Sequence, residues 1–160
     1  MADPSHPRHP HHPHSADVSL VFPPDPAWVR TARDTVRTLL TTTGHSELTD
    51  TAVLLTSEAV TNAINACTTQ ACTAPVTLFA GWAGPHPDGA RLRVLVHDEA
   101  LGLPVCEPAA DDDETGRGMR LVAHSADAWG VCRHGPGQGK ATWFELEARA
   151  LEVRALAAPG

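Results

Sequence analysis

Two helical patterns follow each other directly near the start of the chain, and the later strand patterns are joined by hairpin signals. Apolar residues at helical spacing predict helices over about 26–42 and 46–70, and a third, short helix over 118–126. Strand-like runs cover 17–22, 76–83, 90–97, 129–134 and 140–147. Because the helices are grouped, the order argues against a parallel dinucleotide-binding fold. We expect an α+β protein, a two-layer sandwich of a mainly antiparallel mixed sheet with helices on one face.

Capping and turn residues set the expected boundaries. Asp25 followed by Pro26 is typical of a helix start, and Gly44 is typical of a helix end. The pair Asp88-Gly89 predicts a hairpin turn. The stretch 98–117 shows no periodicity, and so long a connection inside one domain is usually functional or mobile.

The 160 residues suit a single domain, which we place at 17–148. Residues 1–16 are rich in His and Pro and have nothing apolar to bury, so we expect a disordered tail there. Binding of a metal or a partner by its histidines is the alternative. Residues 149–160 are expected to be a C-terminal tail, or a frayed helix.

Composition and charge exclude several classes of function. A net charge of −7 argues against non-specific binding to nucleic acid or an anionic membrane. No apolar run approaches the ~20 residues that span a bilayer. The cysteines form no C-x-x-C pair, so we expect reduced thiols in a cytoplasmic protein, with a disulfide or a zinc pair as the alternative. They are Cys67, Cys72, Cys106 and Cys132.

The second predicted helix places Glu58 and Asn62 four residues apart on one face. A carboxylate in such a pair can act as a general base, and the amide oxygen beside it can bind Mg²⁺. The alternative is a solvated polar face. Asp98 ends a predicted strand, where it is either a turn residue or an acceptor for an exocyclic amine such as that of adenine.

Two glycines flank an arginine just before the third predicted helix. Gly116, Arg117 and Gly118 can together cradle a phosphate, because glycine lets backbone amides turn inward and a helix N-terminus is partly positive. Short glycine pairs before helices are also common without any ligand. Lys140 and Thr142 begin the last strand, where Thr is ordinary and Lys suits a turn.

The order of these motifs resembles that in the ATPase superfamily of DNA gyrase, sensor histidine kinases, large heat-shock chaperones and mismatch-repair ATPases. The motifs are, in chain order, Glu-x-x-x-Asn, Asp, T-G-R-G and G-K-x-T. The resemblance covers about 17–148 and implies the Bergerat α/β sandwich. Four segments look most like the small stand-alone branch of anti-sigma-factor serine/threonine kinases and their actinobacterial relatives. They are EAVTNAINA, VLVHDEALGLP, ETGRGMRLVAHSADAWGV and GKATWFEL.

The resemblance implies a role for each matching residue. It makes Asn62 the Mg²⁺ ligand, Glu58 the general base and Asp98 the acceptor for the adenine amine of ATP, with Thr142 supporting Asp98 through water. The lid over the phosphates then consists of Gly116, Arg117 and Gly118. The family's D-x-G-x-G box keeps its second glycine as Gly102, a further nucleotide-binding residue, whereas Ala100 replaces the first. If the backbone there needs a positive φ or a close approach to adenine, Ala costs about 1 kcal/mol or more.

We therefore expect a regulatory serine/threonine kinase that binds ATP and Mg²⁺, sequesters a sigma factor and phosphorylates a small antagonist protein, with homodimerisation possible. A non-catalytic module whose lid is ordered by ATP is the alternative, which Ala100 favours. A sensor histidine kinase is disfavoured, since the chain shows no membrane span and no helix pair with a phospho-accepting histidine.

Overall fold

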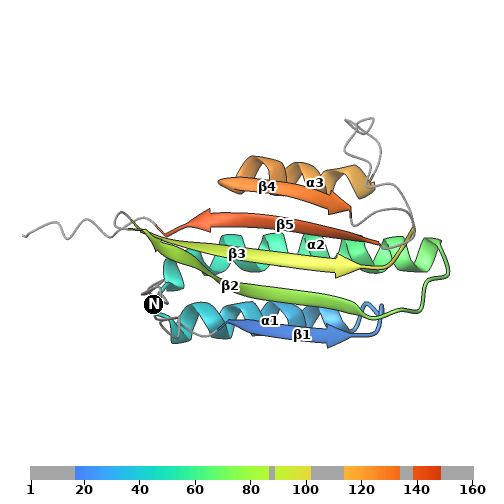
Figure 1. Ribbon diagram of the computed structural model, residues 1–160, viewed down its shortest axis with the longest axis horizontal. Coiled ribbons are helices and arrows are strands. Elements are labelled where there is room, and N and C mark those ends of the chain that lie inside the picture. The colour runs from blue at the N-terminus through green and yellow to red at the C-terminus, as the bar shows by residue number, and fades with distance from the viewer. Residues whose placement is uncertain (1–16, 87–88, 102–113, 134–138, 149–160) are drawn as a thin grey trace, which may run out of the picture.

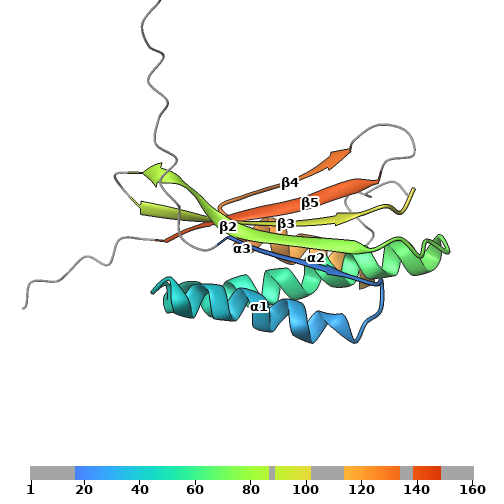
Figure 2. The same ribbon diagram turned by 60° about the horizontal axis from the view of Figure 1, so that its bottom comes forward.

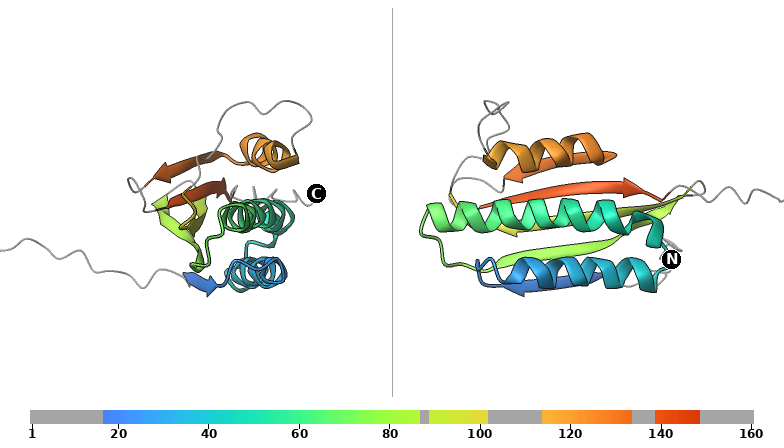
Figure 3. Two further views of the ribbon diagram at one scale, coloured as in Figure 1. Left: turned by 90° about the vertical axis from the view of Figure 1, so that its right-hand side faces the viewer. Right: turned by 180° about the vertical axis from the view of Figure 1, so that it is seen from behind.

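A five-stranded sheet with helices on one face forms the body of the protein (Figures 1–3). The computed structural model describes residues 17–86, 89–101, 114–133 and 139–148. In chain order the elements are β1 (Val18–Phe22), α1 (Trp28–Thr42), the 3₁₀ helix η1 (Ser46–Leu48), α2 (Thr49–Thr69), β2 (Val76–His86), β3 (Gly89–Asp98), α3 (Glu114–Ser125), β4 (Ala128–Arg133) and β5 (Lys140–Glu147).

The strands lie in the order β1-β2-β3-β5-β4. All four neighbouring pairs are antiparallel, so within the described residues the sheet has no parallel pair. The expected α+β two-layer sandwich is confirmed. In place of the expected mixed sheet, the structure has a purely antiparallel one over these strands. Figure 3 shows α2 running along the middle of the helical layer, with α1 on one side of it and α3 on the other.

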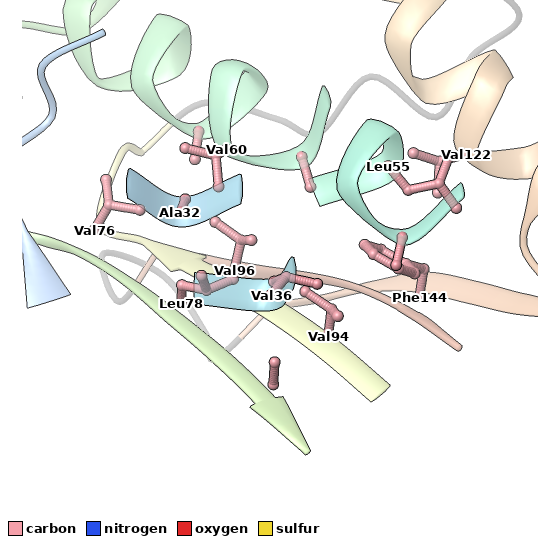
Figure 4. Packing of buried hydrophobic residues seen from close by; sticks show 14 of the residues in the cluster. Ala32, Val36, Leu55, Val60, Val76, Leu78, Val94, Val96, Val122 and Phe144 are labelled. Atoms are coloured by element: carbon pink, nitrogen blue, oxygen red, sulfur yellow. The ribbon is translucent and has the colours of Figure 1, made fainter. Parts of the chain in front are cut away.

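Aliphatic side chains from both layers fill the space between helices and sheet (Figure 4). The strands contribute alternate residues, such as Val94 and Val96 of β3 and Phe144 of β5, and these are buried. From the helices, Val36 and Leu55 reach the same cluster. The chain has no Tyr, and Val, Leu and Ala dominate the cluster.

Most predicted boundaries are close to the observed ones. The Asp25 carboxylate accepts a hydrogen bond from the Ala27 amide at 2.8 Å, and α1 begins one residue later, after a turn. Gly44 follows α1 with a φ of +77°, as expected for a C-terminal glycine. The predicted hairpin turn Asp88-Gly89 lies partly outside the described residues, as do the two proposed tails. No helix within the described ranges is long and apolar enough to cross a membrane.

One predicted boundary is wrong. The third helix was expected to begin at Gly118, after the glycine pair, but α3 begins at Glu114. Gly116, Arg117 and Gly118 therefore belong to its first turns. The glycines mislead because they favour turns and because 114–118 contains no apolar residue to establish a helical period.

Candidate functional site

Asp98 is the last residue of β3, and its side chain lies in the protein interior. Leu92, Val94 and Val96 of the same strand are buried on the side of the sheet that the helices cover. Asp98 continues this alternation and is only 1% exposed. A carboxylate so deeply buried is unfavourable unless a cation or hydrogen-bond donors surround it.

The cation is Lys140, the first residue of β5, which lies directly opposite Asp98 in the sheet. Its Nζ donates to Asp98 Oδ1 at 3.0 Å and lies 2.9 Å from Oδ2. The Ala100 amide also donates to Oδ1, at 3.0 Å. The contact to Oδ2 lacks hydrogen-bond geometry, so this buried oxygen has no hydrogen-bond donor among the described residues. Asp98 Oδ2 thus has a charged neighbour at 2.9 Å but no hydrogen bond from the described groups.

Thr142 lies on β5, two residues after Lys140, and faces the same side of the sheet. It is 3% exposed and pairs with Val96, the residue two before Asp98. The structure therefore brings the predicted pair Asp98 and Thr142 onto one side of neighbouring strands, and it adds Lys140, which the sequence analysis placed at the start of the last strand without a role in the site.

Ala100 and Gly139 fix the backbone around this pair. Ala71 is the only non-glycine residue with positive φ in the described part of the chain, so Ala100 does not require the conformation for which glycine is favoured. The penalty that a positive φ would impose on Ala100 therefore does not arise. Gly139 has a φ of +76°, and a Cβ there would overlap the Asp98 carbonyl oxygen. This glycine lets the start of β5 lie close against the end of β3.

Glu58 and Asn62 lie half-buried on α2, one helical turn apart. Glu58 faces α3, because a Cβ built at Gly118 would overlap Glu58 Oε2. Neither side chain makes a hydrogen bond or ion pair with any described residue, so their oxygen atoms remain available. Both side chains are thus partly covered and partly in contact with solvent.

The glycine segment forms the N-terminal part of α3. The first amides of a helix have no intrahelical acceptor, and inside α3 these are the amides of 114–116, which include Gly116. Figure 1 shows this end of α3 at the same end of the molecule as the end of β3 and the start of β5. Gly102 and the Arg117 side chain lie outside what the structure describes.

Cys67 of α2 is fully buried close to the ion pair. Burial raises the pKa of the Cys67 thiol to about 11, and the negative charge of Asp98 and the neighbouring Cys72 add to this shift. Such a thiol stays protonated and unreactive at neutral pH. The three described cysteines, Cys67, Cys72 and Cys132, are free thiols, as expected. No cluster of three or more His, Cys, Asp or Glu side chains suited to a metal occurs in the described ranges.

The arrangement provides two kinds of chemistry. At the β3–β5 end, a buried carboxylate oxygen can accept a hydrogen bond from an amine. On α2, an amide and a carboxylate offer hard oxygen atoms of the kind that Mg²⁺ prefers, beside a helix end with unpaired amides. Together these features suit a ligand with an amine-bearing base at one end and phosphates at the other.

Comparison with known proteins agrees with this geometry. A search of curated proteins found no match. A family model described as the histidine kinase-like ATPase domain matches residues 22–145, from the last residue of β1 into β5. The match includes Glu58, Asn62, Asp98 and Thr142. The chain therefore belongs to the family of histidine kinase-like ATPase domains.

Proposed function

We propose that this protein is an anti-sigma-factor serine/threonine kinase. Membership of its family supports an ATP-binding regulatory protein of the ATPase and kinase type. The observation that best supports phosphoryl transfer is the pair Glu58 and Asn62. These two half-buried oxygen-bearing side chains have no partner among the described residues and lie on the α2 flank beside α3.

The nucleobase is held at the β3–β5 end of the site. Asp98 Oδ2, the buried acceptor without a donor among the described groups, accepts a hydrogen bond from the adenine amine. Thr142 supports Asp98 through a water molecule. The amides in the first turn of α3 bind the phosphates, and the Arg117 guanidinium adds positive charge.

Phosphoryl transfer takes place on the α2 flank. The Asn62 amide oxygen fits Mg²⁺, which neutralises phosphate charge when it is bound. The serine hydroxyl of the antagonist protein attacks the γ-phosphorus, a new O–P bond forms, and the bond between the γ-phosphorus and the β–γ bridging oxygen breaks to release ADP. Glu58 accepts the hydroxyl proton.

In this proposal the protein acts in the cytoplasm, as a monomer or a homodimer, and has two protein partners. It sequesters a sigma factor, and phosphorylation of the antagonist determines which of the two it binds. The acidic net charge fits partners other than nucleic acid.

Phosphate transfer to an antagonist domain encoded near this gene tests the proposal. With γ-labelled ATP and Mg²⁺, we expect label on a serine of the antagonist. Glu58→Gln removes the base but keeps the shape, so the transfer rate should fall by about 10²–10⁴-fold while ATP affinity changes little. Glu47→Gln, a change on η1 away from the site, should leave the rate unchanged. Equal transfer by wild type and Glu58→Gln would refute the kinase step.

A second candidate is a non-catalytic module whose partner binding depends on ATP. The ion pair between Lys140 and Asp98 favours it, because Asp98 is already partly satisfied and the gain from binding a base is reduced. Calorimetry separates the two functions. ATP binding that Asp98→Asn abolishes, without transfer to any antagonist tested, would support the module.

A further inference from the structure

Lys140 is the only lysine among the 160 residues, and its side chain is just 4% exposed. We propose that Lys140 is an internal competitor for the nucleobase: its ammonium occupies the acceptor positions on Asp98 that an adenine amine needs, and it thereby lowers ATP affinity. This inference rests on the proposed function, because it concerns the same base-binding carboxylate.

The contacts leave little room for a second donor. Asp98 Oδ1 already accepts from both Lys140 Nζ and the Ala100 amide. Oδ2 has no hydrogen-bond donor among the described groups, yet the same ammonium lies 2.9 Å away. With Asp98 at 1% exposure, an incoming amine reaches Oδ2 only if the ammonium moves aside.

The movement required is one of the side chain and not of the backbone. Lys140 is held opposite Asp98 by the register of β3 and β5, and Gly139 packs against the Asp98 carbonyl. Lysine has a flexible four-carbon stem, so rotation about its side-chain bonds can withdraw the ammonium while both strands stay in place. The free protein and the nucleotide complex then differ in the partner of Asp98.

The sign of the effect follows from the cost of a buried unpaired charge. Removing Lys140 leaves the Asp98 carboxylate without its cation, which destabilises the free protein. A ligand that donates an amine to Asp98 recovers part of this loss, so its affinity rises. A ligand without the amine recovers nothing. Lys140→Met should therefore tighten binding of ATP selectively.

The test is calorimetry of two nucleotides with Mg²⁺: ATP, and the purine riboside triphosphate that lacks the 6-amino group. We expect Lys140→Met to bind ATP about tenfold or more tightly than wild type, with less than about a threefold change for the analogue. Lys140→Arg, which keeps a cation on Asp98, should bind ATP no more tightly than wild type. Weaker or equal ATP binding by Lys140→Met would overturn the proposal, as would tighter binding by Lys140→Arg if Lys140→Met does not fold.

A second measurement uses the single lysine in the wild-type protein. Lysine labelled with ¹⁵N at Nζ gives one side-chain ammonium signal, which should shift when ATP and Mg²⁺ saturate the protein but not with the amine-free analogue. An unchanged signal at ATP saturation contradicts displacement of Lys140, while the proposed function stands. If neither wild type nor Lys140→Met binds ATP, the proposed function fails and this inference fails with it.

Discussion

At the scale of single residues, Gly118 links the two helices that flank the proposed phosphate region. A Cβ at this position would overlap Glu58 Oε2 and lie 3.4 Å from Glu58 Cδ. The obstacle is the end of a flexible side chain, so Gly118→Ala should be accommodated by moving the Glu58 carboxylate. Because Ala favours a helix over Gly by about 1 kcal/mol, the free energy of unfolding should hardly fall.

Gly118→Ala should therefore separate stability from activity. We expect an unfolding midpoint in urea within error of wild type and a much slower phosphate transfer, because Glu58 is displaced from the hydroxyl proton. In a Glu58→Gln background, the Ala substitution should slow transfer no further. An additional loss in that background would mean that Gly118 acts independently of Glu58.

Cys67 predicts a dependence of stability on alkaline pH. Burial raises the pKa of its thiol from 9.0 to about 11. The unfolded chain loses this proton near pH 9 while the folded protein keeps it, so the contribution is complete below pH 9 and is lost as pH rises towards 11. The expected loss is on the order of 2–3 kcal/mol.

Urea unfolding at pH 8 and pH 10.5 measures this loss. Cys67→Ala should reduce the difference between the two pH values, whereas Cys132→Ala, at an exposed thiol, should leave it unchanged. The chain has no Tyr and a single Lys, so few other groups titrate in this range. The same pH dependence in Cys67→Ala and wild type would contradict the assignment.

Single residues also mark the limit of prediction from sequence. Asp98 could be singled out because a carboxylate at the end of an apolar strand stands out locally, whereas Thr142 is ordinary in a strand and was named only through the family resemblance. The role of Lys140 could not be predicted, because it depends on a register between strands that are 42 positions apart in the sequence. That Lys140 is the only lysine of the chain drew attention to it, but this does not show that Asp98 is its partner.

At the scale of elements, two glycines with nearly equal φ test how β5 is held against β3. Gly44, after α1, has a φ of +77°, and a Cβ added to it would have no atom within 4 Å. Gly139 has a φ of +76°, but a Cβ added to it would lie 2.7 Å from Glu99 Cα. Gly44→Ala should cost about 1 kcal/mol, for the left-handed backbone alone. Gly139→Ala should cost about 3 kcal/mol, because the backbone of β3 cannot yield.

Urea unfolding of the two variants gives the comparison. The difference between them isolates the close approach of the two strands, since the conformational penalty is common to both. Equal losses would mean that the turn before Lys140 is free to move away from Asp98, and this would also weaken the case for a fixed ion pair.

Helix α2 packs on the sheet through small side chains, among them Ala59 and Ala63, which are 1% and 2% exposed. Ala59→Leu inserts volume into a filled space and should destabilise the protein by about 1–3 kcal/mol. Thr61→Leu, on the exposed side of the same helix, should change stability by less than about 0.5 kcal/mol. Thermal unfolding measures the stability of both variants. Comparable losses of stability would show that a leucine is unfavourable anywhere on α2, and that packing against the sheet does not determine the effect.

Elements with strong periodicity were predicted well, and polar elements were not. β5 was predicted at its observed bounds, 140–147, because Thr142, Phe144 and Leu146 recur at every second position of a short run rich in strand-forming residues. The start of α3 was missed by four residues, because the sequence from Glu114 to Gly118 has no apolar position to indicate a helix. A glycine pair inside a helix is locally unfavourable, so its placement depends on tertiary packing against α2.

At the scale of the whole molecule, hairpin signals were sufficient to predict an antiparallel sheet but not its strand order. β5 lies between β3 and β4, so the last strand of the chain is an interior strand and not an edge strand of the sheet. That insertion is a non-local pairing without a sequence signature. It has a functional consequence, because it brings Lys140 and Thr142 beside Asp98.

The shared core also predicts how the molecule unfolds. One continuous cluster joins the two layers, from Phe22 at one edge of the sheet to Val122 in α3, with Trp28 and Trp129 packed against it. Since β5 joins β4 to the other strands, the β4 edge cannot keep its pairing once β5 is lost. We therefore expect a single cooperative transition in urea.

Variants that keep Trp28 or Trp129 as the sole one of the four tryptophans make the test local. Trp28, the first residue of α1, stacks on Phe22 with ring centroids 5.9 Å apart, and Trp129 lies on β4 opposite Phe144. Fluorescence of either residue and the far-ultraviolet circular dichroism should give the same midpoint. A lower midpoint at Trp129 alone would show that β4 and α3 open separately from the rest. In that case β4 and α3, whose first turns we propose bind the phosphates, would form a separate unfolding unit. Nucleotide binding could then order this unit, and the free energy of binding would include the cost of ordering it.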